Sequence, residues 1–512
     1  MPAPMSPPLS IRSGFTRNAR RPSRHAYGAL VFAAIGLAGL GLRAVVLHSS
    51  LGTLDSDEAV VGLMARHFTS GGFRAFYWGQ PYGGTVETGL ASTLFTVFGP
   101  STGALKAVPL LLDAAATALT WRVGRRLTTE GAAVAAGALV WLWPGTYLWW
   151  SIKERGFYEA GLCLTLVAAL LALRICAAGN GRTWPEWALL GLTAGVGWWQ
   201  TPQVVYILVP VGLWLLWHLR ARAWRATIAV PGAVVGAAPW LWSNLSNGFA
   251  SLRPPPSPVK GTYLDHLVTL AHVGGPMTLG LRVPYVTKWL DPAPVAQCLY
   301  AVILVVIAAG CARRWPGGAL AALVLAMFPF LHAILPLAGT VAEGRYTLFA
   351  LPWIALAIAH RCQRMVAVTV VSVVAIILTI AGLAAMRGQT DPYAPDRHVP
   401  RSLATLRAGL AGHGITHLWA NYWVAYRLTF ETGEKVIAAP ASSDRYAPFA
   451  DAVGADPRAA HVFMSGSHTD AIFNGALQQR HVPYERWTAG ADWVIYVPGT
   501  PIGPTDIDNS YP

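Results

Sequence analysis

Three carboxylates stand close together early in the chain, at the start of an apolar segment. They are Asp55, Asp57 and Glu58, and a fourth acid, Glu87, follows a turn rich in aromatic residues, Gly and Pro. The acids have a structural explanation, because acidic residues cap and stabilise a helix N-terminus. They also have a chemical one: crowded acids beside a low-dielectric medium repel each other, so at least one should bind a proton, a cation or a basic substrate group. The chemical interpretation is a general base with a supporting acid.

Basic residues later in the chain would complement these acids. Lys153, Glu154 and Arg155 lie between two apolar segments, and Arg345, followed by Tyr346, opens a late one. An Arg at such a boundary can simply reach a lipid headgroup. It can also clamp a phosphate, because the guanidinium is a planar set of donors. Outward-facing acids with an outward-facing Arg suggest a reaction between a lipid phosphate and a hydroxyl.

Aromatic residues occupy the turn before Glu87. Tyr82 and its neighbours at positions 76–78 could stack on a sugar ring, although most aromatic residues of a membrane protein form interfacial belts. Asp113 falls inside an apolar run, where it should be protonated or paired, with Arg43 as a candidate partner. We assign no metal site to the scattered histidines.

The composition indicates a membrane protein. The chain has 512 residues, of which 54% are hydrophobic and 12% charged. Apolar runs of about 18 residues or more recur without the alternation of strands, which predicts membrane-spanning helices. The net charge of +14 fits Arg held in cytoplasmic loops better than nucleic-acid binding, because no basic stripe accompanies an exposed aromatic platform. The five cysteines have no metal-site spacing and predict no disulfide framework.

The fold class that we predict is an all-α polytopic membrane protein with about eleven or more spans and a small C-terminal extracytoplasmic α/β domain. Residues 1–25 should be a disordered cytoplasmic N-terminus, 26–388 the membrane module with a catalytic outer loop at 48–102, and 389–512 the α/β domain. The segment 85–98 is short enough for a re-entrant or interfacial helix. The expected spans are 26–47, 103–121, 131–150, 157–176, 186–200, 203–219, 226–243, 295–312, 317–335, 345–360 and 365–386.

This arrangement places the basic clusters inside and the acid-bearing loop outside, as the positive-inside rule requires. The segments 151–156, 244–294 and 336–344 also fall outside. In the C-terminal domain, we expect helices at 402–412 and 469–479. Strands are expected at 417–422, 435–439, 460–464 and 493–497.

At these residues the sequence resembles the GT-C glycosyltransferases, most nearly the family 39 enzymes: protein O-mannosyltransferases and aminoarabinose-transferase-like proteins. The resemblance covers roughly residues 26–390. It consists of the Asp57–Glu58 pair after the first span, the aromatic and Pro turn, a short helix ending Phe-Gly, and a span ending Gly-Arg-Arg-Leu. Relatives often carry Lys-Pro-Pro-Leu or His-Pro-Pro-Leu after the turn, where this chain has Gln80-Pro81-Tyr82.

The resemblance implies an inverting transfer of a hexosyl or pentosyl group from a polyprenyl-phosphate sugar on the extracytoplasmic face of a bacterial plasma membrane. Asp57 would be the base, with Glu58 as the second residue of the catalytic pair. Arg345 would be a phosphate ligand, and the adjacent Tyr346 would also contact the substrate. Lys153 or Arg155 would replace the missing basic residue after the turn. Acids such as Glu58, Asp55, Glu87 and Glu154 would orient the acceptor or the sugar.

The expected partners are the donor, the bilayer and an acceptor glycan, lipid or protein, without nucleic acid. No cofactor is required, although the acids leave room for a divalent cation. Two other functions stay open: a transporter or flippase of polyprenyl-linked glycans, which should carry ionisable groups near the midplane, and a non-catalytic partner.

Overall fold

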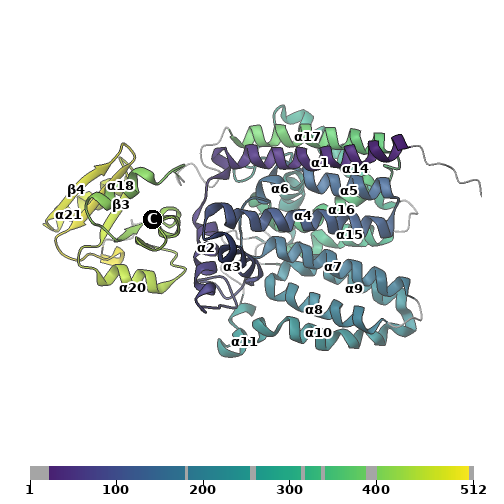
Figure 1. Ribbon diagram of the computed structural model, residues 1–512, viewed down its shortest axis with the longest axis horizontal. Coiled ribbons are helices and arrows are strands. Elements are labelled where there is room, and N and C mark those ends of the chain that lie inside the picture. The colour runs from purple at the N-terminus through teal and green to yellow at the C-terminus, as the bar shows by residue number, and fades with distance from the viewer. Residues whose placement is uncertain are drawn as a thin grey trace, which may run out of the picture.

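The protein consists of a helical body and a small α/β domain at one end of it (Figure 1). The computed structural model describes residues 22–178, 183–253, 261–312, 318–335, 341–387 and 400–506. The helices of the body are α1 (Pro22–Leu47), α2 (Ser56–Thr69), α3 (Val86–Phe98), α4 (Thr102–Leu127), α5 (Glu130–Leu142), α6 (Gly145–Trp150), α7 (Tyr158–Ala177), α8 (Trp184–Gln200), α9 (Val205–Leu219), α10 (Ala229–Gly236), α11 (Ala238–Ser246), α12 (Tyr263–Thr269), α13 (Gly275–Thr278), α14 (Ala293–Ala312), α15 (Gly318–Ile334), α16 (Leu351–Ala359) and α17 (Met365–Arg387).

Six helices of the described residues are long and apolar enough to cross a membrane, and the bent pair α10–α11 makes a seventh if it is one span. Each segment expected to span forms a helix or a pair of helices, so the polytopic all-α body is confirmed. The other expected spans coincide with shorter helices, among them the apolar α5, α15 and the segment 345–359, so the count of about eleven spans stays a prediction. A helix of 13 residues such as α5 is about 20 Å long, which crosses a bilayer only with help from its flanks.

Three boundaries differ from the expectation. The predicted span 131–150 is broken at the cis bond Trp143-Pro144 into α5 and α6. The predicted span 226–243 bends by 58° between α10 and α11. The first helix starts at Pro22, inside the segment that we expected to be disordered, while residues 1–21 lie outside the described residues.

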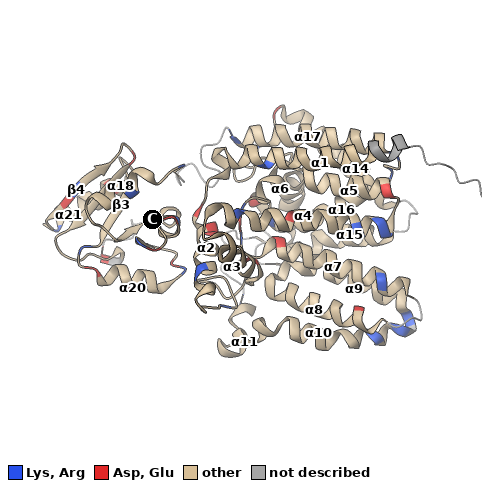
Figure 2. Cartoon of the chain, viewed as in Figure 1, with Lys and Arg blue, Asp and Glu red and all other residues tan. Residues whose placement is uncertain are grey.

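Helices α2 and α3 lie across the end of the body that faces the C-terminal domain (Figure 1). The other helix ends, away from that domain, carry many of the Lys and Arg residues (Figure 2). This distribution is consistent with a cytoplasmic side opposite the C-terminal domain.

The C-terminal domain is built on a five-stranded sheet with strand order β2-β1-β3-β5-β4. Strands β2, β1 and β3 are parallel, whereas β5 is antiparallel to both β3 and β4. The sequence analysis missed β4, α19 and α20, and Tyr422, expected at a strand end, begins α19 instead. The elements are α18 (Ala404–Gly412), β1 (His417–Ala420), α19 (Tyr422–Glu431), β2 (Ile437–Pro440), α20 (Ala447–Ala455), β3 (Ala460–Met464), α21 (His468–Gln479), β4 (Tyr484–Ala489) and β5 (Trp493–Pro498).

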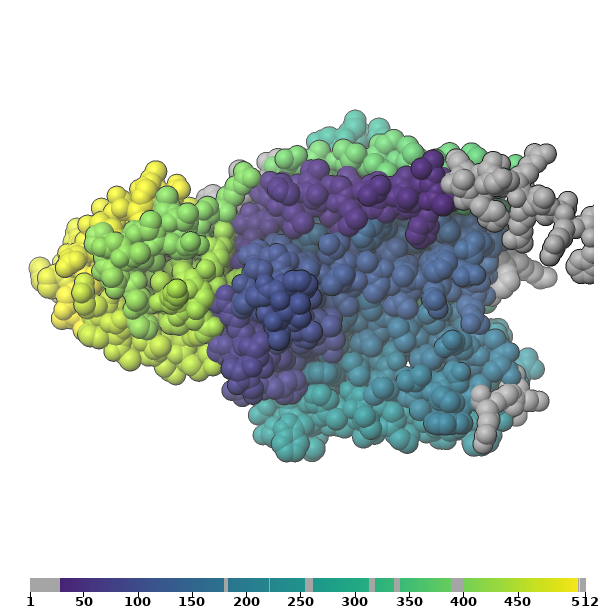
Figure 3. Space-filling view, viewed as in Figure 1, coloured from purple at the N-terminus to yellow at the C-terminus, as the bar shows by residue number. Residues whose placement is uncertain are grey.

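The C-terminal domain packs directly on α2 (Figure 3). Tyr426, Phe430 and Phe449 belong to the same apolar core as the membrane body. Gly62 makes the close approach of α2 and α19 feasible, because a Cβ there would lie 2.5 Å from the Phe430 ring. Burial of these large aromatic side chains stabilises the contact by about 1.5–3 kcal/mol each.

Candidate active site

The acidic cluster forms the start of α2. Asp55 is the N-cap residue and accepts from the backbone N–H of Glu58, while the Glu58 carboxylate accepts from the backbone N–H of Asp55. This capping box satisfies donors that a helix N-terminus leaves unpaired. The structural interpretation therefore holds for Asp55 and Glu58.

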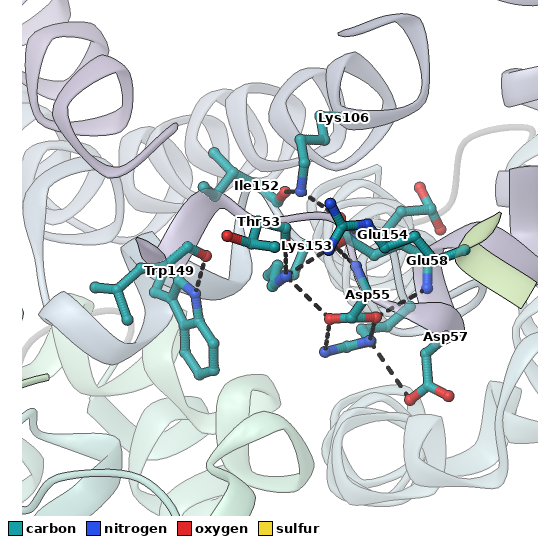
Figure 4. A network of polar contacts seen from close by, with 12 residues as sticks. Thr53, Asp55, Asp57, Glu58, Lys106, Trp149, Ile152, Lys153 and Glu154 are labelled. Atoms are coloured by element: carbon teal, nitrogen blue, oxygen red, sulfur yellow. Dashed lines mark hydrogen bonds and ion pairs between the residues drawn. The ribbon is translucent and has the colours of Figure 1, made fainter. Parts of the chain in front are cut away.

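Three buried cations contact the two carboxylates of that cap (Figure 4). Arg155 donates to both oxygens of Asp55, at 2.7 and 2.9 Å, and Lys153 contacts Asp55 Oδ2 at 2.9 Å. Lys153 also lies 2.7 Å from Glu58 Oε2, and Lys106 lies 2.6 Å from Glu58 Oε1. Asp55 and Glu58 are fully buried, so these contacts compensate charges that water cannot reach. The network fixes the loop 151–156 against α2.

Asp57 points the other way, into a pocket. Its side chain is 22% exposed, in contrast to its two acidic neighbours. Tyr422 donates to Asp57 Oδ1 at 2.6 Å, and Arg155 Nη1 lies 3.4 Å from Oδ2. Successive helix residues diverge by about 100°, which explains why residue 57 faces the pocket while residue 58 faces the buried cations. Asp57 is the carboxylate that lines this pocket.

The pocket gathers residues from five separate parts of the chain. The start of α2, the 77–82 turn, the 155–158 segment, the start of the 3₁₀ helix at 345–350 and the C-terminal domain all contribute. Its lining residues are Asp57, Tyr77, Gln80, Tyr82, Arg155, Phe157, Tyr158, Arg345, Tyr346 and Arg445.

Tyrosines form much of the wall. Burial, with the neighbouring Asp57 carboxylate, raises the pKa of Tyr77 and of Tyr422. Burial also raises the pKa of Tyr82. These phenols therefore remain protonated near neutral pH and act as hydrogen-bond donors. Tyr77 uses its hydroxyl to donate to the backbone carbonyl of Asp57 at 3.0 Å.

Arg345 lines the same pocket as Asp57 but belongs to a segment far from it in the sequence. Its Nη2 lies 2.5 Å from Glu343 Oε2 and 3.2 Å from the Tyr346 hydroxyl. The guanidinium also lies over the rings of Trp150 and Tyr158, at 5.9 and 5.5 Å from their centroids. These contacts hold the side chain within the protein, so lipid snorkelling alone does not describe it.

Glu87 and Glu154 are buried beside each other behind the pocket. Glu87 accepts from the backbone N–H of Ala160 at 2.8 Å, and Glu154 accepts from that of Gly156 at 2.7 Å. Burial, reinforced by the Glu87 carboxyl, raises the pKa of Glu154 well above its ordinary value. Two carboxyls in such a place favour sharing a proton over carrying two charges.

The predicted site residues thus separate into two groups. Asp57, Tyr82, Arg155, Arg345 and Tyr346 line the pocket. The pocket lining does not include the rest, which are buried around it: Asp55, Glu58, Glu87, Lys153 and Glu154.

Sequence reasoning missed two contributors from the C-terminal domain, Tyr422 and Arg445. Neither stands in a recognisable motif, and each contacts a residue 365 positions away. The Gln80-containing turn, noted for lacking a basic residue, turns out to be where Arg445 docks. The only signal in the sequence was the absence of a basic residue from the turn at Gln80, which left room for a basic residue from another segment.

Two further predictions can be checked. Arg43 pairs with Asp113, as expected, and the pair is buried in the body. Among the described residues, no group of three or more His, Cys, Asp or Glu side chains could hold a metal ion. The acids expected to leave room for one, Asp55 and Glu58, are instead each bound by two basic side chains.

Comparison with known proteins bears on the fold. No protein-family model matches the sequence, and no curated protein matches it. Among solved structures, ArnT from Cupriavidus metallidurans in the apo state is similar, with a TM-score of 0.61 and 12% identity over 92% of this chain and 98% of that one. ArnT bound to undecaprenyl phosphate gives a TM-score of 0.61 and 12% identity over 94% and 99%. The chain therefore shares the fold of these two ArnT structures.

Proposed function

We propose that the protein is a membrane glycosyltransferase that moves a sugar from a polyprenyl-phosphate donor to an acceptor hydroxyl on the extracytoplasmic face. The observation that carries the proposal is the meeting of Asp57 and Arg345 in one pocket at the end of the helical body. A carboxylate and guanidinium groups are the two kinds of group that this transfer needs. The similarity to an ArnT structure that holds undecaprenyl phosphate supports a donor of this class.

The transfer would proceed by attack of the acceptor oxygen on the anomeric carbon, from the face opposite the phosphate. The C1–O bond to phosphate breaks, its electron pair stays on the phosphate oxygen, and the configuration inverts. The transition state has the character of an oxocarbenium ion, as in glycoside hydrolysis. Asp57 accepts the proton of the attacking hydroxyl. Such base catalysis contributes on the order of 10²–10⁴-fold.

Arg345 and Arg155 would stabilise the charge that grows on the leaving phosphate. Phosphate leaves readily once its charge is stabilised, so the scheme needs no strong general acid. The buried ion pairs of Asp55 and Glu58 have a positioning role in this scheme. They hold Arg155 and the start of α2, and with them the relative placement of Asp57.

The membrane setting completes the proposal. The pocket is lined by residues of both the helical body and the C-terminal domain. Many of the Lys and Arg residues lie at the helix ends away from that domain (Figure 2). By the positive-inside rule, the pocket would face away from the cytoplasm of a bacterial plasma membrane.

The decisive experiment offers purified protein in nanodiscs a panel of radiolabelled polyprenyl-phosphate sugars together with a crude envelope extract as acceptor. Transfer of label from the lipid fraction to a product, with release of polyprenyl phosphate, is the expected result. Retention of all label on every donor, in a preparation that still binds undecaprenyl phosphate, would contradict the proposed activity.

A further inference from the structure

The C-terminal domain places one arginine in the pocket. Arg445 precedes α20, and its Nη1 donates to Gln80 Oε1 at 3.2 Å. Its guanidinium carbon lies 5.7 Å from the ring centroids of Tyr77 and Tyr422. Contacts with the 77–80 turn of the membrane body and with Tyr422 of its own domain therefore hold Arg445 at the pocket wall.

The backbone fit at this contact is close. Gly79 has a φ of +72°, which favours glycine, and a Cβ there would lie 2.7 Å from the Arg445 Cα. The turn before α3 and the segment before α20 are thus in direct backbone apposition. The position of Arg445 is set by this packing, so its place in the pocket does not depend on a long free side chain.

Arg445 differs from the other cations of the site in its charge balance. Lys106, Lys153, Arg155 and Arg345 each lie within 3 Å of a carboxylate oxygen. Arg445 belongs to none of the ion pairs within 4 Å in the described part of the chain, so the Asp57 carboxylate of the same pocket acts on it only at longer range. The buried Nε of Arg445 has no hydrogen-bond partner. A half-buried guanidinium that is always charged favours an anionic ligand at that place.

The chemistry of the proposed transfer supplies such an anion. A polyprenyl-phosphate sugar is a phosphodiester with one negative charge. When its C1–O bond breaks, the electron pair remains on the oxygen and the phosphate becomes a monoester, whose second acid group has a pKa near 6. The leaving group therefore gains about one negative charge near neutral pH, and an uncompensated guanidinium would stabilise that gain.

We propose that Arg445 binds the phosphate of the polyprenyl carrier, so that the C-terminal domain is a working part of the active site. This inference rests on the proposed function for its choice of anion. Arg345 and Arg155 hold the phosphate from the membrane body, and Arg445 closes on it from the domain above. The C-terminal domain thereby couples phosphate binding to its own docking on α2.

The test measures binding of undecaprenyl phosphate to the full chain in phosphatidylcholine nanodiscs. We compare wild type, Arg445→Gln, Arg445→Ala and the matched control Arg458→Ala, which removes an exposed arginine of the same domain. We expect the Kd to rise at least tenfold in both Arg445 variants and to stay unchanged in Arg458→Ala. Undecaprenol, which lacks the phosphate, should bind all four proteins equally.

Gln at position 445 can keep the contact with Gln80, so Arg445→Gln separates loss of charge from loss of docking. A Kd for undecaprenyl phosphate within twofold of wild type in a folded Arg445→Gln protein would overturn the inference. An equal loss of undecaprenol binding would also overturn it, because that would indicate a general collapse of the pocket. The readout is binding, so it is independent of turnover: absence of transfer with intact, Arg445-dependent binding would count against the proposed function alone.

Discussion

Tyr422 donates its hydroxyl to Asp57 Oδ1 at 2.6 Å, joining the first residue of α19 to the first turn of α2 across 365 positions of sequence. The contact lies at the seam between the helical body and the C-terminal domain. Because Arg155 approaches the other oxygen of Asp57, the carboxylate is held from both sides. The orientation of the proposed base therefore depends on the docked domain.

Replacing Tyr422 by Phe removes this hydrogen bond and leaves the ring in place. A hydrogen bond to a charged group contributes about 1.5–3 kcal/mol, so we expect kcat to fall by roughly 10–100-fold. The KM for the donor should stay near wild type, because Tyr422 positions Asp57 and does not hold phosphate. Tyr484→Phe, which removes a hydroxyl bonded to Asn474 elsewhere in the domain, is the control. A rise in donor KM with unchanged kcat would show that Tyr422 has a different role.

Asp57→Asn keeps the size of the side chain and removes its ability to accept a proton. Turnover should fall on the order of 10²–10⁴-fold, while undecaprenyl phosphate still binds. Asp451→Asn, at an exposed position of α20, should have wild-type turnover. Transfer assays on these two variants test whether Asp57 is the general base. Near-wild-type turnover by Asp57→Asn would show that it is not.

Arg345→Ala should weaken donor binding, because the pocket loses a phosphate ligand. We expect an increase of about tenfold or more in the KM for the donor, consistent with a charge-assisted bond of about 1.5–3 kcal/mol. Arg345→Lys should restore only part of the lost donor binding, since an ammonium lacks the planar pair of donors. An unchanged donor KM in Arg345→Ala would indicate that the side chain serves the Glu343 pair and the aromatic wall only.

The sequence was informative wherever the determinants are local. Apolar runs predict helices, and the Asp55–Glu58 spacing predicts a capped helix start, which the structure contains. The distribution of charge placed an acid and a late arginine on the same outer face, and the family resemblance implied that they serve one site. Only the resemblance distinguished Asp57 from Glu58, because the residues alone do not say which side of α2 faces the buried lysines.

Sequence patterns did not predict the contacts between the C-terminal domain and the helical body. Tyr422 and Arg445 belong to α19 and to the segment before α20, and neither element was predicted. Their place in the site depends on tertiary packing of Phe430 and Phe449 against the body core. The break at Trp143-Pro144 did have a signal, the Pro144-Gly145 pair, but the apolar run continues through it and so predicted a single span.

Glu58 and Glu154 offer a matched test of charge state, because both are fully buried carboxyls near the same loop. Glu58→Gln leaves Lys106 without a carboxylate and Lys153 with Asp55 alone, which should destabilise the protein by about 3–5 kcal/mol. Glu154→Gln should be tolerated near neutral pH, because burial raises the pKa of Glu154 and favours its neutral form. Thermal unfolding of both variants measures which one loses more stability. A larger loss of stability in Glu154→Gln than in Glu58→Gln would contradict the neutral state assigned to Glu154.

The pH dependence of Glu154 follows from the same shift. The pKa of Glu154 is higher in the folded protein than in the unfolded chain. At pH values between these two pKa values, the folded protein therefore binds a proton that the unfolded chain does not. Stability from this group is complete below pH 4.5, the ordinary value, and declines as the pH rises through the folded value. Glu154→Gln should flatten this part of the stability profile.

His461 makes the stability of the C-terminal domain depend on pH in the opposite direction. The side chain is fully buried in β3, where its Nε2 lies 3.1 Å from the carbonyl oxygen of Ile502, and burial lowers the pKa of His461 to about 3. Between about pH 3 and the ordinary 6.5, the unfolded chain binds a proton that the folded domain does not. Stability should therefore fall as the pH falls through this window, by up to about 1.4 kcal/mol per pH unit from this group.

His461→Gln retains a donor for the Ile502 carbonyl and cannot titrate, so its unfolding temperature should change less between pH 7 and pH 5 than that of wild type. Tryptophan-fluorescence melts of the full chain measure this difference, because Trp493 lies in the neighbouring strand β5, which pairs with β3. His468→Gln, at an exposed position of α21, should keep the wild-type profile. Parallel profiles for wild type and His461→Gln would mean that His461 takes up its proton without unfolding, and would place the acid sensitivity of the domain elsewhere.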